Sequence, residues 1–362
     1  MGDFFFEEEI MKLREMQRPI IISGPCSAET EDQVIETAKL LKATGKVNIL
    51  RAGIWKPRTR PDSFEGVGEV GLEWLVNAGK ETDLPVITEV ANSSHVEKAL
   101  KAGFDRLWIG ARTSVNPFTV QEIADSLKGV DNIEVLIKNP INPDVNLWIG
   151  AIERFYRAGI NEVHAIHRGF SSFKSDKYRN EPMWEIPLAL KRVFPEVKLI
   201  CDPSHICGRR DILLEVSQKA IDLIYDGLMI ESHLNPDEAW SDAKQQILPS
   251  DLGELVSRLV LRNEQVDDPV FTKNLSELRQ KIDEIDRDLM KLIASRMEIT
   301  NEVGRFKKKN NMTILQPERW AQIKHLHQEM SKEFALSDKF VEKYLSAIHQ
   351  ESIRHQTKIM NG

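Results

Sequence analysis

Residues 19–54 read PIIISGPCSAETEDQVIETAKLLKATGKVNILRAGI, and this stretch indicates the fold of most of the chain. It begins and ends with short apolar runs, 19–24 and 49–54, and places the helix-like segment 31–43 between them. A strand, a helix and a second strand in this order are typical of a parallel sheet, because parallel neighbours need a crossover connection. Both runs are apolar at nearly every position, which predicts strands that are buried on both faces.

The same unit repeats along the chain. Further runs rich in Ile, Val or Leu occupy residues 85–90, 106–110, 134–138, 162–167, 198–201 and 227–231. Together with the first two runs they make eight, and intervening segments such as 31–43 and 217–225 have the pattern of helices. Eight strand–helix units favour a closed (β/α)8 barrel of the TIM type, with an open doubly wound sheet as the alternative. No Gly-rich dinucleotide or phosphate loop of the usual spacing follows the first run.

Charge and composition argue against several classes of protein. The 362 residues carry a net charge of −7, which gives no support for nucleic-acid binding. No stretch of about 18 apolar residues is present, and the acidic start of the chain lacks the basic segment of a signal peptide. Cys26, Cys201 and Cys207 are too few for a disulfide framework. We therefore expect a cytoplasmic protein without a membrane span.

The pattern changes after Arg262. Residues 263–272 are polar and contain Asp267-Asp268-Pro269, which predicts a linker between a barrel domain, 1–262, and a helical domain, 273–362. In the second domain apolar residues recur at alternating steps of three and four, the pattern of a long helix. This apolar seam consists of Leu278, Ile282, Ile285, Leu289, Leu292, Ile299, Val303 and Phe306. A second amphipathic segment covers residues 338–356.

The apolar seam spans roughly 30 residues, or about 45 Å at 1.5 Å per residue. A tail of about 90 residues cannot easily bury so long a helix against itself. A helix from a second copy of the chain is the natural partner, so we expect a homo-oligomer, most simply a dimer through the tail.

Polar residues stand at or just after the carboxyl end of each predicted strand. They are Cys26, Arg51 with Lys56, Glu89, Arg112, Lys138, Arg168, Asp202 with His205, and Glu231 followed by Asp242. The carboxyl ends of the strands form the catalytic face of such barrels. One Arg after one strand is most simply a surface salt bridge, but five cationic residues at one edge are not scattered surface charge. They predict a ligand with several negative charges, since Arg pairs well with carboxylate and phosphate.

Four residues of this edge could hold a metal ion. Cys26, His205, Glu231 and Asp242 offer one thiolate, one imidazole and two carboxylates. This mixed donor set suits a first-row divalent ion such as Mn, Fe, Co or Zn better than Ca or Mg. Taken singly, Cys26 and His205 are more simply read as structural residues. Their common position at the rim of the barrel favours ligation instead.

Five short motifs lie at this edge of the barrel. They are Gly24-Pro25-Cys26-Ser27-Ala28-Glu29, Lys56-Pro57-Arg58-Thr59, Gly110-Ala111-Arg112, Asp202-Pro203-Ser204-His205 and Met229-Ile230-Glu231. Over residues 15–262 they resemble the signatures of the DAHP synthase family in its compact single-barrel type. The most specific motif is the one that begins at Lys56. The related octulosonate-phosphate synthases, which use another phosphosugar, share the barrel and the enolpyruvate site but lack this motif, and they are the alternative.

The resemblance implies a condensation of phosphoenolpyruvate with erythrose 4-phosphate. The substrate-binding residues that it implies are Arg51, Lys56, Arg58, Thr59, Arg112, Lys138, Arg168 and Asp202. Arg58 and Thr59 would face the sugar phosphate, and Lys56 is the expected acid near the aldehyde oxygen. A divalent metal on the four ligands named above would polarise that aldehyde as a Lewis acid. Arg60, in place of the usual Ser, and the run 138–143 depart from the family pattern.

The tail also carries polar and charged residues that are candidates for binding a ligand. Arg296 lies on the apolar seam where Ile or Leu is expected, and a buried guanidinium needs an anion beside it. Lys307 follows three turns later on nearly the same face, whereas Arg279 points about a quarter-turn away and could reach a partner chain. Ser352 and Gln356 share a face at a spacing of four. The simpler alternative is a dimerisation helix with solvated charges.

A set of tail residues carries a second resemblance. The set is Leu278-Arg279-Gln280-Lys281-Ile282, Arg296, Val303-Gly304, Lys307, Gln316 with Arg319, and Ser352 with Gln356. Over residues 273–357 it resembles the chorismate mutases that form an intertwined helical dimer. The resemblance implies rearrangement of chorismate to prephenate, which needs a polar cage around a folded dicarboxylate rather than an acid, a base or a metal.

The resemblance also implies a role for each member of the cage. Arg279 and Arg296 would clamp carboxylates, Lys307 and Gln356 would flank the ether oxygen, and Gln316, Arg319 and Ser352 would complete the cage. Trp320 stands where relatives often place a Glu that accepts from the substrate hydroxyl, so either turnover is slower or another residue takes over this contact. In fusions of this kind the mutase half also senses chorismate or prephenate and restrains the synthase, which we adopt as a hypothesis. The alternative is a catalytically dead tail that only dimerises and regulates.

Overall fold

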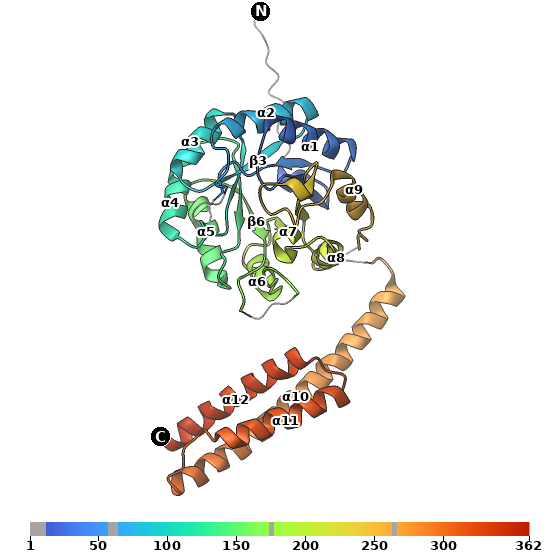
Figure 1. Ribbon diagram of the computed structural model, residues 1–362. Helices are drawn as coiled ribbons and strands as arrows, with labels where there is room; N and C mark the ends of the chain where they lie inside the picture. Colours follow the sequence, from blue (N-terminus) through green and yellow to red (C-terminus); the bar gives the residue numbers. More distant parts are fainter. Residues whose placement is uncertain (1–11, 57–63, 174–176, 263–265, 362) are drawn as a thin grey trace, which may run out of the picture. The chain divides into compact units, whose positions relative to one another are not determined.

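The computed structural model describes residues 12–56, 64–173, 177–262 and 266–361. The chain forms two compact units, residues 1–264 and 265–362. The first unit is a closed barrel of eight parallel strands, in which each strand pairs with its neighbours in sequence and β1 pairs with β8. Figure 1 shows the helices around the outside of these strands. The closed barrel confirms the predicted (β/α)8 fold and rules out the open sheet.

The strands fall within the predicted apolar runs. They are β1 (Ile20–Gly24), β2 (Ile49–Arg51), β3 (Val86–Val90), β4 (Arg106–Ile109), β5 (Glu134–Lys138), β6 (Glu162–His167), β7 (Leu199–Cys201) and β8 (Gly227–Glu231). β2 is shorter than its run, because the chain turns after Arg51 toward the loop that follows β1. Gly53 forms an isolated bridge with Ser27, and a side chain on Gly53 would collide with the carbonyl oxygen of Cys26.

Helices connect the strands on the outer face. They are α1 (Glu31–Ala43), α2 (Val70–Thr82), α3 (Ser93–Lys101), α4 (Pro117–Ser126), α5 (Val145–Arg157), α6 (Glu185–Val193), α7 (Pro203–Cys207), α8 (Leu213–Asp222) and α9 (Pro249–Ser257). α1 has the predicted bounds, and the Thr30 side chain caps its first turn. The helix expected at 217–225 is shifted to α8. Leu213 is buried in its first turn, and the positive φ of Ile224 prevents the helix from continuing.

The strand residues divide between two apolar layers. Residues such as Ile21 face the helices, and alternate residues fill the interior of the barrel. The inner layer contains Ile20, Ile22, Ile49, Ile87, Trp108, Leu136, Ile166, Ile200 and Met229. Leu13 of the short helix η1 (Leu13–Glu15), together with Met16, joins this layer and closes the amino end of the barrel. The polar residues that follow the strands therefore lie at the end of the barrel that this apolar layer does not close.

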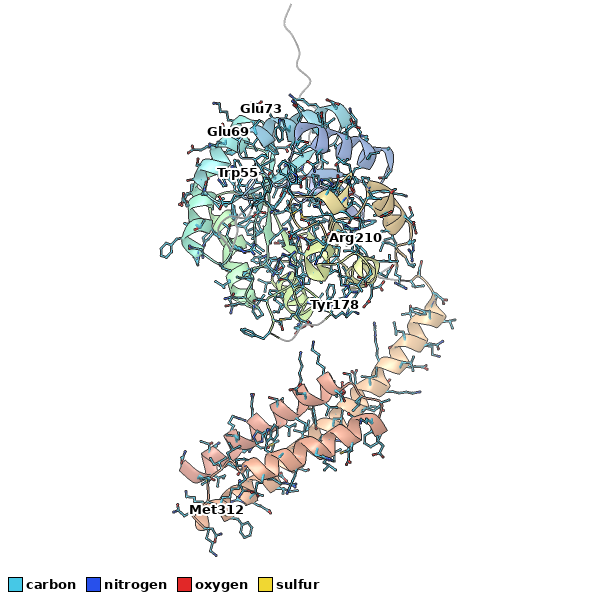
Figure 2. All side chains as sticks on the ribbon, viewed as in Figure 1. Trp55, Glu69, Glu73, Tyr178, Arg210 and Met312 are labelled. Carbon is cyan, nitrogen blue, oxygen red and sulfur yellow. The ribbon has the colours of Figure 1, made fainter. Side chains whose placement is uncertain are left out.

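The second unit consists of α10 (Pro269–Lys309), α11 (Pro317–Glu333) and α12 (Asp338–Asn361), drawn in orange to red in Figure 1. Figure 2 labels Met312 in the turn between α10 and α11. α10 begins inside the predicted linker, because the Asp268 side chain accepts from the backbone N–H groups of Val270 and Phe271, and Pro269 suits the first turn. Residues 269–272 are thus helical, which shortens the predicted linker.

α12 packs along α10 and leaves the apolar seam uncovered. The contact buries Met297, Thr300 and Gly304 of α10, and the guanidinium of Arg296 donates to the hydroxyl of Ser352. The side chains of the apolar seam are 40–68% exposed in the single chain. None of the described helices is both long and apolar enough to span a membrane.

Candidate active sites

The polar residues that follow the strands gather around one cavity at the carboxyl end of the barrel. The cavity is lined by Lys56, Glu89, Gly110, Ala111, Arg112, Lys138, Arg168, Arg179, His205 and Asp242. Gly110 makes room for the carboxylate of Glu89, which a side chain at this position would displace. That carboxylate accepts a hydrogen bond of 2.9 Å from the indole of Trp108, at the top of the inner apolar layer.

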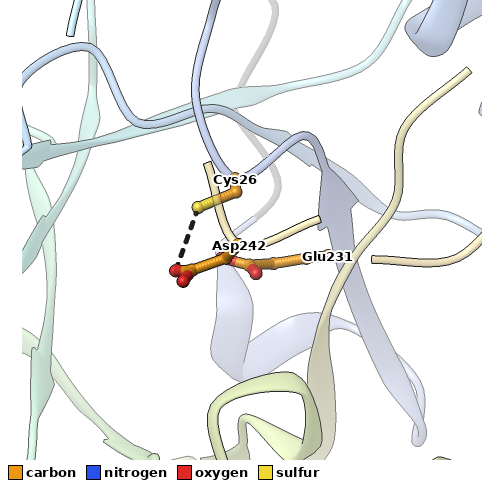
Figure 3. Close-up of side chains that lie close together, drawn as sticks. All are labelled: Cys26, Glu231 and Asp242. Atoms are coloured by element: carbon orange, nitrogen blue, oxygen red, sulfur yellow. Dashed lines mark hydrogen bonds between the residues drawn. The ribbon is translucent and has the colours of Figure 1, made fainter. Parts of the chain in front are cut away.

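Three of the four predicted metal ligands meet beside this cavity. Cys26, Glu231 and Asp242 present donor atoms that all lie within 4.8 Å of one another (Figure 3). Cys26 follows β1, Glu231 ends β8, and Asp242 lies between β8 and α9. The fourth, His205 of α7, adjoins this trio, with its Nε2 3.8 Å from Oε1 of Glu231. The structure thus brings three donor side chains from separate segments together and places His205 beside one of them.

The charges of these groups fit a divalent cation. Burial would raise the pKa of Asp242, but the charges of His205 and Arg179 hold it well below its usual value. Burial raises the pKa of the Cys26 thiol to about 11, so metal binding must displace its proton. Oε1 of Glu231 is buried and accepts no hydrogen bond from a described residue, although it lies 3.3 Å from Nη1 of Arg51, so it remains able to ligate a cation. A thiolate, an imidazole and two carboxylates suit a first-row ion.

Asp202 orients two members of the site. Its carboxylate lies 2.8 Å from Nζ of Lys138 and 3.0 Å from Nδ1 of His205. Burial would raise the pKa of Asp202, but the charges of His205 and Lys138 hold it well below its usual value. Because Nδ1 of His205 faces this carboxylate, its Nε2 is the nitrogen turned toward Glu231. Burial lowers the pKa of His205, so the neutral ring can act as a ligand.

Two cationic side chains lie beside the predicted metal ligands. The buried guanidinium of Arg51 sits over the ring of Trp108 at 4.7 Å and donates to the Cys26 carbonyl oxygen at 3.1 Å. Its Nε and Nη1 have no hydrogen-bond partner among the described residues, although Nη1 lies 3.3 Å from Glu231. Nζ of Lys56 donates to the same carbonyl at 3.1 Å and lies 3.0 Å from Sγ of Cys26. Nη1 is thus ion-paired with Glu231, whereas the buried Nε–H group has no partner among the described residues and indicates a place for an anionic ligand.

The structure therefore collects most of the predicted substrate-binding residues of the barrel at its carboxyl end. These are Arg51, Lys56, Arg112, Lys138, Arg168 and Asp202. Arg58 and Thr59, predicted to face the sugar phosphate, lie outside the described residues, as does Arg60.

In the helical unit, a cavity of about 680 Å³ collects six of the seven predicted mutase residues. They are Arg296, Lys307, Gln316, Arg319, Ser352 and Gln356. Nη1 of Arg296 donates to Ser352 at 2.7 Å, and Oε1 of Gln356 is buried without a partner among the described residues. Arg279 is exposed and is not part of the lining.

Arg296 itself departs from expectation. We expected its guanidinium to be buried, because it lies on the apolar seam, but in the single chain it is exposed. The reason is that no part of the described chain covers the seam. The anion-binding role predicted for Arg296 now rests on its place in the cavity beside Lys307, and not on burial.

Comparison with known proteins assigns both units. The DAHP synthetase I family matches residues 8–266, well over half of the chain. The chain belongs to the DAHP synthetase I family. A second family, chorismate mutase type II, matches residues 278–357, within the helical unit. Both resemblances that the motifs carried are thereby confirmed.

Individual known proteins are also similar to this chain. The phospho-2-dehydro-3-deoxyheptonate aldolase of Thermotoga maritima is 33% identical over 227 residues, which are 63% of this chain and 64% of that protein. The crystal structure of the T. maritima enzyme of that name has a TM-score of 0.59 at 31% identity and covers 66% of this chain and 67% of that one. The 2-dehydro-3-deoxyphosphooctonate aldolase of Desulfotalea psychrophila is 28% identical over 67% of this chain and 88% of that protein. The chain thus spans less than two thirds of the first of these relatives.

The DAHP synthetase I barrel also has, near the predicted metal ligands, an arginine that the sequence patterns did not indicate. Arg179, between β6 and α6, donates to Asp242 at 3.0 Å and to Gln245 at 2.7 Å. Gln245 in turn donates to Oε2 of Glu231 at 2.6 Å. These contacts hold two of the predicted metal ligands from outside the donor set. No pattern in the sequence marks Arg179, because a single Arg in a polar loop is typical of surface charge.

Its neighbour Asn180 connects two parts of the same site. Oδ1 of Asn180 accepts from Nη1 of Arg168 at 2.6 Å, and its Nδ2 donates to the backbone carbonyl of His205 at 2.6 Å. One side chain thus joins a cation that lines the cavity to the segment that carries a predicted metal ligand. Gly169 allows this approach, because a side chain there would meet Asn180 at less than 3 Å.

A second group with metal-ligand chemistry lies at the amino end of the barrel. Glu134, Glu162 and His164 have donor atoms close together, but each carboxylate is already paired, with Arg106 at 2.6 Å and with Arg14 at 2.9 Å. Nδ1 of His164 accepts a backbone N–H just before β7 at 3.4 Å, so Nε2 carries the ring proton and is not a ligand. Burial lowers the pKa of His164 to about 3, which keeps the ring neutral. We interpret this group as a polar closure of the barrel.

Proposed function

We propose that the barrel condenses phosphoenolpyruvate with erythrose 4-phosphate to give DAHP and phosphate, the first step of the shikimate pathway. We further propose that the helical unit rearranges chorismate to prephenate. The main support is that cationic side chains and metal donors converge on one cavity in a chain of the DAHP synthetase I family. A cytoplasmic location is part of the proposal and is supported by three free, buried cysteines.

The barrel cavity suits the enolpyruvate anion. Arg112, Lys138 and Arg168 line it and can pair with a carboxylate and a phosphate. Burial lowers the pKa of Arg168 to about 10, which leaves it charged at neutral pH. Arg51 adds N–H groups without hydrogen-bond partners among the described residues. These groups would hold the enolpyruvate so that its reactive carbon faces the sugar aldehyde.

Cys26, His205, Glu231 and Asp242 would hold the divalent metal, which when bound polarises the sugar aldehyde as a Lewis acid. Lys56 reaches the same region, 3.0 Å from Sγ of Cys26. Burial would lower the pKa of Lys56, but the Cys26 thiolate, which forms when a metal displaces its proton, and the Glu231 carboxylate raise it, so the Lys56 ammonium is protonated at neutral pH. We assign to Lys56 the proton that the aldehyde oxygen takes up as the enol carbon attacks. Water then adds to the resulting cation, and phosphate leaves.

The tail cavity supports a cage for a dicarboxylate. Arg296 suits one carboxylate, and Lys307 with Gln356 suits the ether oxygen, where negative charge grows as its bond breaks. Gln316, Arg319 and Ser352 complete the cage on the same chain. Arg279 would come from a partner chain.

Assays of both reactions on the purified full chain test the proposal. We expect phosphate release from enolpyruvate and erythrose 4-phosphate, and separately the loss of chorismate. Because enolpyruvate supplies three carbons, an octulosonate product needs a five-carbon sugar phosphate. Turnover with the five-carbon sugar alone would therefore favour the alternative synthase. A chain that condenses but does not deplete chorismate would leave the tail as a dimerisation and regulatory module.

We propose that two copies pair through the apolar seam in an intertwined dimer. The exposed seam and the absence of Arg279 from the lining of its own cavity support this arrangement. A dimer would cover the seam and could bring the Arg279 side chain of one copy to the cavity of the other. Analytical ultracentrifugation of the full chain measures the state directly. A monomer at micromolar concentration would contradict the proposal.

Asn180→Ala is expected to weaken substrate binding and metal binding together. The change removes both 2.6 Å hydrogen bonds that join Arg168 to the His205 backbone. We expect the KM for enolpyruvate to rise and the metal affinity to fall, each by roughly tenfold. KM is measured at saturating metal, and affinity by equilibrium dialysis without substrate. Asn146→Ala, an exposed Asn on α5, is the control, and a change in only one property would show that Asn180 does not couple the two.

We also propose that prephenate or chorismate bound in the tail restrains condensation. A ligand can shift the barrel only if it binds more tightly to one state of the whole chain than to another. Titration of each ligand should therefore inhibit condensation by the full chain and leave a chain truncated after Arg262 unaffected. Equal sensitivity of the two chains, or none in the full chain, would reduce the protein to a tandem of two independent enzymes.

A further inference from the structure

The tail cavity contains a histidine to which the proposed mechanism gives no task. His349 of α12 lines the cavity together with Arg296 and Lys307. Its ring stacks on the ring of Trp320, with centroids 3.9 Å apart and planes inclined by 24°. Among the described residues, neither ring nitrogen of His349 has a hydrogen-bond partner. A half-buried imidazole in this position is available to a ligand.

The charges around His349 set its protonation state. Partial burial, followed by the charges of Arg296 and Lys307, lowers the pKa of His349, so the ring is neutral at neutral pH. A neutral imidazole has one nitrogen that donates and one that accepts. The described lining of the cavity contains no Asp or Glu, so acceptors are scarce in it.

The hydroxyl groups of the cavity are largely occupied. Oγ of Ser352 accepts from Arg296 and donates to the carbonyl of Ile348 at 2.7 Å. Oγ1 of Thr300 donates to the carbonyl of Arg296 at 3.0 Å. Gln316 is already part of the proposed cage, and Ser295 also lines the cavity but is exposed. His349 is therefore the half-buried lining group with an acceptor atom that no described residue uses and that the proposed mechanism has not assigned.

The proposed substrate has one group that the cage leaves without a partner. Chorismate carries two carboxylates, an ether oxygen and a secondary alcohol. The cationic side chains suit the carboxylates, and Lys307 with Gln356 suits the ether oxygen, but the alcohol O–H needs an acceptor once water is excluded. We infer that His349 accepts the hydrogen bond of this alcohol and that Trp320 positions the ring by stacking. The inference rests on the proposed mutase function.

The stacking of Trp320 on His349 fixes the orientation of the imidazole ring. A stacked imidazole presents its edge, where both nitrogens lie, to the space beside the stack. Trp320 covers one face of His349 and restricts rotation of the ring. Trp320 is thus a positioning residue, whereas His349 touches the substrate.

The test compares two substrates on four forms of the full chain. The substrates are chorismate and an analogue in which hydrogen replaces the alcohol. The forms are the parent, His349→Ile, which keeps bulk but has no acceptor, His349→Gln, which keeps an acceptor, and His355→Ile. His355 lies on the same helix but outside the cavity, where its ring is bonded to Asn301. Condensation by the barrel in each preparation provides an internal measure of intact protein.

We expect the parent and His355→Ile to prefer chorismate over the analogue by about tenfold in kcat/KM, the scale of one neutral hydrogen bond. His349→Ile should lose this preference through a slower reaction with chorismate alone, and His349→Gln should keep most of it. A full preference in His349→Ile would overturn the role of His349. Absence of chorismate turnover in the parent would instead remove the mutase function, and this inference with it.

Discussion

Cys26→Ala is expected to leave the barrel folded and to abolish condensation. Cys26 is a small, fully buried side chain after β1, so its truncation removes a proposed metal donor without opening a large cavity. Three donors are a poor substitute for four, and the Cys26 Sγ is also the group beside which Lys56 is held. An excess of chelator should reproduce the defect in the parent, and added Mn should restore only the parent. Phosphate release and bound metal are measured on the same samples.

The control for this variant is another buried cysteine. Cys201 ends β7 and belongs to the outer apolar layer, away from the donor set. Cys201→Ala should bind metal and condense at the rate of the parent. Chorismate turnover should be normal in both variants, because the helical unit contains none of the predicted metal ligands. Full condensation by the parent in excess chelator would rule out the metal assignment.

Arg296→Ala is expected to lower the kcat/KM for chorismate by roughly two to three orders of magnitude, because a substrate carboxylate loses its charged partner. The guanidinium also holds the hydroxyl of Ser352, so the change releases that side chain of the cage as well. Condensation measured without added chorismate or prephenate should be unchanged. The two rates are measured on one preparation, which excludes a general loss of folded protein.

Arg305→Ala is the matched control for this second variant. Arg305 is exposed on the same helix, nine residues further on, and is not part of the lining of the cavity. Its removal should leave both reactions intact. If Arg305→Ala were as harmful as Arg296→Ala, general charge on α10 would explain the effect. If chelator also stopped the mutase, the metal-free mechanism for the tail would be wrong.

The strands of the barrel could be predicted from the sequence because they are buried on both faces. β5, β6 and β8 have the predicted bounds because both faces of a barrel strand are covered, which leaves long apolar runs with sharp ends. The same regularity placed the next polar residue of each run at the carboxyl edge, so the candidate metal ligands and the cations of the cavity could be named before their contacts were known. α8 was harder, since its end depends on the left-handed backbone of Ile224, a residue that usually avoids it.

Contacts between loops could not be predicted in this way. Arg179 and Asn180 lie in a polar segment, and their roles depend on the approach of the loops after β7 and β8. That approach is set by tertiary packing and has no periodic signal. His349 was missed for a related reason: within the helical pattern of α12 one ring has no feature that distinguishes it until α11 supplies Trp320.

The uninterrupted length of α10 makes it a rigid rod that can convert a small tilt at one end into a larger displacement at the other. Pro269 and Arg296 are 27 residues apart on one helix, a distance of about 40 Å along its axis. A rod of that length turns a small tilt at the cavity, about 5°, into a sideways displacement of about 3–4 Å at its first turn. The helix starts directly after the segment that joins it to the barrel, so an angular change around a bound dicarboxylate would arrive there magnified. Two glycines inserted into the exposed first turns of α10 would act as a flexible joint and should weaken the proposed inhibition of condensation by prephenate or chorismate while leaving both cavities unchanged.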